Sequence, residues 1–152
     1  YAGISPRTNA VQLIIWCRHN NYELVLFETE SHTGSPIYHT DVLMYVGTEI
    51  IGICFDVITK EHRDYVKEKV NAYHKVIELT PEQIQNFCGN AIEAKNNNNE
   101  LFLIISTTAF NALNHDQKEK LFNSYKDIIH SDIPTIEKYG GGSARCMLTE
   151  LF

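Results

Sequence analysis

Residues 42–55 read VLMYVGTEIIGICF, which is two apolar runs on either side of a short turn at Gly47-Thr48. Apolar runs of this length, bounded by turn residues, are typical of buried strands. The runs Val42–Val46 and Ile50–Phe55 therefore predict a tight hairpin at the centre of the chain.

The order of elements around this hairpin repeats along the chain. A helix and a strand follow the hairpin, and after a short helical turn the same strand–strand–helix–strand series occurs again. The period is roughly fifty residues, within the range of radial and stacked repeat architectures. The expected elements are a helix at about 60–73, a strand at 75–79, a helical turn at 81–87, strands at 91–94 and 101–106, a helix at about 117–125 and a strand at 127–130.

Both ends of the chain carry incomplete copies of this unit. The start offers a strand at 1–4, a helix at about 8–18 and a strand at 24–27, but no preceding hairpin. The end offers a strand from Cys146 to Phe152 that has no partner in the chain. We therefore expect a single α/β domain over residues 1–152 that forms the C-terminal part, about half, of a larger repeat array.

Composition limits the classes of partner. The chain has 152 residues, of which 43% are hydrophobic, and this is ample for one core. It carries 13 basic against 19 acidic residues, a net charge of −6, which does not favour nucleic acid or an anionic membrane as a partner. No apolar run approaches the length of a membrane span.

The four cysteines, Cys17, Cys54, Cys88 and Cys146, are widely spaced and form no Cys-x-x-Cys pair. This spacing argues against a zinc site and is typical of reduced, intracellular thiols, so we expect a cytoplasmic protein. The first three lie in apolar stretches and are expected to be small core residues.

Three consecutive glycines precede the last cysteine. Residues 140–146 read GGGSARC and lead into an apolar segment. Glycines weaken helices and strands, but they let the backbone turn tightly and approach another group closely. A turn that presents one thiol at a strand end is typical of a nucleophilic cysteine, so Cys146 is a candidate nucleophile. The alternative is a glycine turn before a buried structural cysteine.

Two further motifs lie nearer the start of the chain. Residues 38–41 read YHTD and enter the first strand of the hairpin, where His39 and Asp41 would point to the same side. One face would then carry a proton-transfer group beside a carboxylate; the alternative is a polar strand edge in solvent. Residues 3–9 read GISPRTN and place Arg7 on a turn before a helix, where it could equally be a surface charge.

In this order, the three motifs resemble those of the guanidino-group-modifying superfamily of arginine deiminases, dimethylarginine hydrolases and amidinotransferases. Residues 3–9 are similar to the family's Gly-x-Ser-x-Arg-Thr-Asn turn, His39 and Asp41 match its His-x-Asp pair, and Cys146 matches its C-terminal nucleophile. Gly89-Asn90 also resembles a turn of the family, with a role in positioning backbone. The similarity covers essentially the whole chain and is greatest to a deiminase-like, citrulline- or arginine-utilising branch.

The resemblance implies a pentein-type α/β propeller of five ββαβ units around a central active site, with no metal and no organic cofactor. It implies that Cys146 attacks the planar carbon of a guanidino or ureido group in an arginine-like or citrulline-like amino acid. His39 would protonate the departing nitrogen and then activate the water that resolves the thiol adduct. Asp41 would bind the guanidinium nitrogens, and Arg7 the substrate's α-carboxylate.

Two departures from the family pattern keep other functions open. Gly141 stands five residues before the nucleophile, where arginine deiminases commonly have Arg, which argues against simple arginine deimination. The family's other guanidinium-binding carboxylates belong to an N-terminal half that we expect to be a missing partner of this chain. An amidinotransferase, or a non-catalytic propeller that binds arginine-like ligands or a partner protein, remains an alternative, and a homodimer is open.

Overall fold

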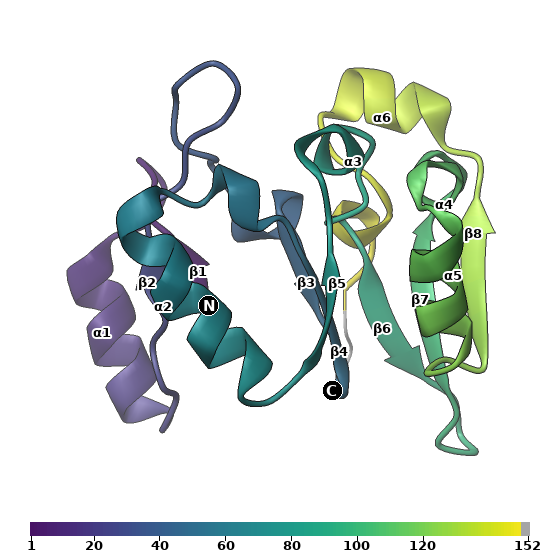
Figure 1. The fold of residues 1–152 in the computed structure, drawn as a ribbon, viewed down its shortest axis with the longest axis horizontal. Coiled ribbons are helices and arrows are strands. Elements are labelled where there is room, and N and C mark those ends of the chain that lie inside the picture. Colours follow the sequence, from purple (N-terminus) through teal and green to yellow (C-terminus); the bar gives the residue numbers. More distant parts are fainter. Residues whose placement is uncertain (150–152) are drawn as a thin grey trace.

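The computed structural model describes residues 1–149 as an α/β fold with one two-stranded and two three-stranded sheets (Figure 1). The helices and strands are β1 (Ala2–Gly3), α1 (Ala10–His19), β2 (Leu26–Phe27), β3 (Met44–Val46), β4 (Ile50–Ile53), α2 (Lys60–Asn71), β5 (Lys75–Glu78), α3 (Pro81–Gln85), β6 (Ile92–Lys95), β7 (Leu101–Ser106), α4 (Thr107–Ala112), α5 (His115–Phe122), β8 (Asp127–Ser131) and α6 (Pro134–Gly140). Short 3₁₀ helices form at η1 (Thr40–Val42), η2 (Phe55–Val57) and η3 (Ala144–Met147).

The two three-stranded sheets have the same connectivity. In each, an antiparallel hairpin is followed by a helical crossover and a strand that pairs in parallel, giving the orders β3-β4-β5 and β6-β7-β8. Parallel neighbours require such a crossover, which α2 provides in the first unit and α4 with α5 in the second. The α/β class and the twofold strand–strand–helix–strand order are therefore confirmed.

The core is formed where the sheets meet their crossover helices. β4 is the middle strand of its sheet and is buried along its whole length, with Ile51 and Ile53 fully inaccessible. A strand covered on both faces reads as a continuous apolar run, which is why the 50–53 stretch shows no alternation. α2 contributes Val66 and Val70 to the same core, and α5 contributes Leu121.

Two buried glutamines connect the repeated units. Gln83 of α3 and Gln117 of α5 each complete a capping box at the start of their helix. Their side-chain amides also bind each other, with N···O distances of 2.7 and 3.0 Å. Each Nε2 further donates across to the other unit, from Gln83 to the Ala112 carbonyl and from Gln117 to the Glu78 carbonyl. The junction between the units is thus a satisfied polar network within an apolar core.

Several expected boundaries are wrong. The strand expected at 42–46 begins only at Met44, because Thr40–Val42 forms η1, closed by the bond from the Leu43 N–H to the Thr40 carbonyl. The strand expected from Cys146 begins instead as η3, closed by the bond from the Cys146 N–H to the Ser143 carbonyl; residues 150–152 of that prediction lie outside the described residues.

Two helices were not expected from the sequence. α4 follows β7 without a break, and its N-cap Ser106 accepts a hydrogen bond from the Ala109 N–H. α6 starts with Pro134 in its first turn and is followed by Gly141 in the left-handed conformation. Both helices carry ordinary start or stop signals, but they are only seven residues long or shorter and show no apolar periodicity to reveal them.

We predict that the protein loses stability as the pH rises above about 9, partly through Cys88. Burial raises the pKa of this thiol from 9.0 to about 12, and its sulfur donates to the Ala109 carbonyl at 3.3 Å. Between these pH values the unfolded chain releases the proton while the folded chain keeps it, so the free energy of unfolding falls with rising pH. Urea titrations from pH 8 to 11 should show this fall.

The Cys88→Ala variant separates this thiol from other alkaline groups, such as the buried Tyr45 and Tyr125, whose pKa values burial also raises. The variant should start from a lower stability, because it leaves a cavity, but its stability should fall less steeply above pH 9. Equal slopes for the two proteins would show that Cys88 does not contribute.

Candidate active site

Cys146 lies in η3, directly after the glycine loop, and its thiol is exposed. The other cysteines, Cys17, Cys54 and Cys88, are buried as expected, at 7%, 0% and 3% exposure. Accessibility therefore distinguishes Cys146 from the rest and leaves it as the candidate nucleophile of the chain.

The glycine loop requires glycine at two positions, Gly141 and Gly142, for two different reasons. Gly141 has φ +69°, a left-handed conformation that ends α6 and that L side chains rarely adopt. At Gly142, an added Cβ would lie 2.8 Å from the Cys146 sulfur and 2.9 Å from its Cβ. The loop thus curls back until its backbone touches the thiol, which only glycine allows.

The side chain of Asn90 is hydrogen-bonded to this loop. It is buried, at 3% exposure, and its Oδ1 accepts hydrogen bonds from the N–H groups of Ser143 and Arg145 at 3.2 and 3.1 Å. Its Nδ2 lies 3.2 Å from the Cys146 sulfur. The sequence suggested only a backbone-positioning role for the Gly89-Asn90 turn, because a side chain's contact with a loop some fifty residues away leaves no local pattern.

Gly89 brings the His-x-Asp segment to the same place. An added Cβ here would lie 2.5 Å from the Val42 carbonyl oxygen and 3.0 Å from the Met44 nitrogen, so the two segments pack backbone against backbone. Asn90 Nδ2 also lies 3.4 Å from the Asp41 carbonyl oxygen. The turn at 89–90 therefore joins the segment of residues 39–41 to that of Cys146.

Asp41 is the residue that directly faces the thiol. Its Oδ2 lies 3.8 Å from the Cys146 sulfur, and its Oδ1 is buried without a hydrogen-bond partner among the described residues. His39 Nδ1 lies 3.9 Å from Asp41 Oδ1, which is too long for a hydrogen bond. In the part of the chain that the structure describes, His39 makes no direct bond to Cys146.

The predicted reason for the proximity of His39 and Asp41 is wrong, although the residues are close. They do not share a strand face, because His39 is the N-cap of η1 and Asp41 lies within it. A 3₁₀ turn brings nearby side chains together over a shorter rise than a strand does.

Arg7 lies beside His39, next to the ring nitrogen that faces away from Asp41. Its Nη1 lies 3.4 Å from His39 Nε2, and its guanidinium carbon lies 5.0 Å from the centre of the Tyr38 ring. Since the guanidinium can only donate, His39 Nε2 accepts, which leaves the imidazole proton on Nδ1, toward Asp41. The Tyr38 hydroxyl in turn donates to the Gly141 carbonyl at 3.2 Å.

The turn of residues 3–9 is attached to the same segment by hydrogen bonds. The Ser5 hydroxyl accepts from the Arg7 N–H and donates to the Tyr38 carbonyl, both at 3.1 Å. The Gly3 N–H donates to the Thr40 hydroxyl at 2.9 Å. The structure thus brings the four predicted site residues into one connected series, from Arg7 through His39 and Asp41 to Cys146.

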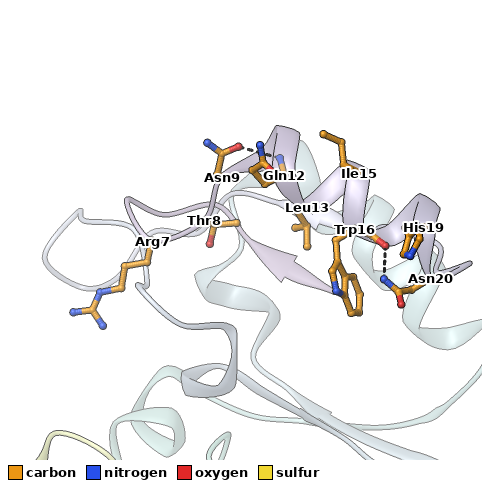
Figure 2. Close-up of a pocket in the computed structure, with 9 residues that line it drawn as sticks. All are labelled: Arg7, Thr8, Asn9, Gln12, Leu13, Ile15, Trp16, His19 and Asn20. Carbon is orange, nitrogen blue, oxygen red and sulfur yellow. Dashed lines mark hydrogen bonds between the residues drawn. The ribbon is translucent and has the colours of Figure 1, made fainter.

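Two hollows border this series. One of about 480 Å³ has Asp41 and Arg145 on its wall and extends between β3 and β6 toward Glu93. The other, of about 570 Å³, follows α1, and Figure 2 shows Arg7 at its end, pointing away from the other lining residues. Neither hollow is lined by Cys146, but the one beside Asp41 has carboxylates on its wall and the α1 hollow has none, so the hollow beside Asp41 is the better candidate for a guanidinium ligand.

No group of three or more His, Cys, Asp or Glu side chains arranged to hold a metal ion occurs in residues 1–149. Over the same residues, every helix is too short or too polar to cross a membrane.

Comparison with known proteins gives a family match over the whole chain and a set of similar structures. The model of the family described as N,N dimethylarginine dimethylhydrolase, eukaryotic, matches residues 1–152. No curated protein matches significantly in sequence. Among solved structures, apo ArgZ, an arginine dihydrolase from the ornithine–ammonia cycle in cyanobacteria, is 18% identical with a TM-score of 0.71 over 98% of this chain and 22% of that chain.

Two other structures are similar to a comparable degree. A variant of the N-terminal domain of ArgZ, covalently bound to a reaction intermediate, is 17% identical with a TM-score of 0.67 over 95% of this chain and 48% of that one. Unliganded AgrE is 14% identical with a TM-score of 0.73 over 95% of this chain and 19% of that chain. The chain thus spans about half of the ArgZ N-terminal domain, and at these identities the likeness concerns the fold.

We predict that a neutral alkylating reagent modifies one cysteine in the native protein. Iodoacetamide at pH 8 should add a single group at Cys146, since the other thiols are buried and burial also raises the pKa of Cys54 and Cys88. Intact mass and peptide mapping measure this, and Cys146→Ser should remain unmodified. Equal labelling of two or more cysteines in folded protein would contradict the burial pattern.

Proposed function

Because the chain belongs to the N,N-dimethylarginine dimethylhydrolase family, within the pentein amidinotransferase and deiminase superfamily, we propose that it is a cysteine-dependent hydrolase. Its proposed substrate carries a guanidino or ureido group and is arginine, citrulline or a related amino acid. The observation that carries this proposal is the exposed Cys146 thiol 3.8 Å from the Asp41 carboxylate, with His39 next to that carboxylate.

Asp41 supplies the electrostatic part of recognition. Its carboxylate is two-thirds buried, and one oxygen has no hydrogen-bond donor among the described residues. A guanidinium donates from a planar fork that matches a carboxylate, so the Asp41 side chain is suited to bind one through the oxygen that faces Cys146. A guanidinium bound in this way places its central carbon beside the Cys146 sulfur, which is the geometry that nucleophilic attack needs.

The proposed reaction then has two steps. The Cys146 thiol loses its proton and His39 gains one, the sulfur then forms a bond to the central carbon, the bond from that carbon to the leaving nitrogen breaks, and His39 gives the gained proton to this nitrogen. In the second step His39 removes a proton from water, whose oxygen attacks the same carbon and releases the sulfur. The covalently bound intermediate in the similar ArgZ domain supports a covalent route.

Arg7 is proposed to bind the far end of the substrate. It is exposed, stacks on Tyr38 and lies beside His39, so its guanidinium is at the mouth of the site. A fixed guanidinium is suited to an α-carboxylate. We further propose that the two ββαβ units belong to a pentein propeller whose other units complete the substrate cage, since the chain spans 48% of the similar ArgZ domain.

Turnover should depend on Cys146. The complete protein, including the units that complete the substrate cage, is incubated with arginine, citrulline, N-methylated arginine or agmatine, and released ammonia, amine and amino-acid products are quantified by mass spectrometry. We expect one of these to be consumed, and Cys146→Ser to lower the rate by on the order of a thousandfold or more, since the nucleophile is lost. Near-normal turnover by this variant would rule out the covalent mechanism.

Cys146 should react faster with a cationic alkylating reagent than with a neutral one, and this preference should depend on Asp41. The measurement does not require the protein to turn over a substrate. Chloroacetamidine carries a positive charge and chloroacetamide does not, and both alkylate thiols. Two unit charges 4 Å apart in water interact by about 1 kcal/mol, so Asp41→Asn should lower the ratio of the two alkylation rates by about fivefold or more. Asp56→Asn, a substitution at an exposed carboxylate in η2, is the control. An unchanged ratio in Asp41→Asn would mean that Asp41 does not bind the guanidinium.

A further inference from the structure

We propose that Asn90 is a positioning residue for Cys146: its side-chain N–H donates to the sulfur, orients it and favours the thiolate. This deepens the proposed function, on which it rests, because it gives Asn90 a role only if Cys146 is the nucleophile. The role goes beyond holding backbone, and it is carried by four contacts of one buried amide.

The orientation of the Asn90 amide follows from its partners. Oxygen and nitrogen of an amide are distinguished by their hydrogen bonds. One atom faces the N–H groups of Ser143 and Arg145, which can only donate, so this atom is the oxygen. The nitrogen is then the atom 3.2 Å from the Cys146 sulfur and 3.4 Å from the Asp41 carbonyl oxygen.

Every hydrogen-bonding position of this amide is in use. An Asn side chain offers two acceptor and two donor positions, and Asn90 directs two to the loop backbone, one to the sulfur and one to Asp41. At 3% exposure it has little access to water, so an unmade bond would cost about 1–3 kcal/mol. The amide is therefore held in one orientation, with one N–H aimed at the sulfur.

The groups around Cys146 have opposing effects on its charge. Asp41 faces the sulfur from η1 and disfavours a thiolate by like charge, and His39 lies behind Asp41. Arg145 is the neighbouring cation in η3, and β7, on which η3 packs, carries no titratable side chain between Leu101 and Ser106. A hydrogen bond to the charged form favours that form, so the Asn90 N–H opposes Asp41.

The loop has a second anchor that does not involve Asn90. Glu137 of α6 accepts from the Ser143 hydroxyl at 2.8 Å and from the Thr108 hydroxyl of α4 at 2.7 Å. Ser143 is fully buried, so this bridge ties the end of the loop, directly before η3, to the second ββαβ unit. Variants at Asn90 should therefore keep the loop in place.

Asn90→Asp separates the bond to sulfur from the bonds to backbone. The carboxylate can still accept from Ser143 and Arg145, but it cannot donate to the sulfur and adds a negative charge there. We expect the midpoint of the pH profile for iodoacetamide alkylation of Cys146 to rise by about one pH unit or more, which is about tenfold slower labelling below the midpoint. The plateau rate at high pH should change little, because the exposure of the sulfur is unchanged.

Asn97→Asp is the matched control. Asn97 is exposed in the loop between β6 and β7, and its substitution by Asp changes the charge of the protein in the same way. Its profile should coincide with that of the unaltered protein. A purely structural role for Asn90 would instead lower the rate at all pH values and leave the midpoint unchanged. An Asn90→Asp midpoint equal to that of Asn97→Asp would overturn the proposal.

A second measurement leaves Asn90 intact, in case Asn90→Asp does not fold. In protein labelled with ¹⁵N at asparagine, the Asn90 side-chain amide signals should shift with the same midpoint as the alkylation of Cys146. This shift should vanish in Cys146→Ser, and signals that stay constant in the unaltered protein would also overturn the proposal. Neither measurement needs turnover, so failure to find a substrate and failure of this inference give separate results.

Discussion

Gly89 packs directly on the backbone of residues 42–44, and the candidate site depends on this contact. It places Asn90 between η1 and η3, where one amide bonds to the loop before Cys146 and to the Asp41 carbonyl. Because an added Cβ would lie 2.5 Å from the Val42 carbonyl, any other residue would push the two segments apart. The distance between thiol and carboxylate is therefore set by a glycine that carries out no chemistry.

Two cysteines near this contact, Cys88 and Cys146, lie in opposite environments. Cys88, one residue before Gly89, is buried and donates to a backbone carbonyl, and burial raises its pKa to about 12. Cys146 is exposed, accepts from Asn90 and faces a carboxylate. Environment rather than residue type separates an inert thiol from a candidate nucleophile.

The repeated units supply the rigid frame for this arrangement. Each unit places a hairpin beside a parallel strand, and the crossover helices cover the sheets (Figure 1). The capping boxes at Thr80–Gln83 and Asn114–Gln117 are visible in the sequence as helix starts. The bonds between Gln83 and Gln117 are not, because they join residues that no local pattern relates. These bonds fix one unit against the other.

The sequence by itself determined the α/β class, the twofold ββαβ order, the buried cysteines and the motifs around Arg7, His39, Asp41 and Cys146, because these depend on local periodicity, turn chemistry and residue type. It did not determine that residues 40–42 and 144–147 form 3₁₀ turns instead of strand ends. It also did not reveal the four bonds of Asn90. Those features arise from contacts between segments some fifty or more residues apart, and only the packing of the two units against each other decides them.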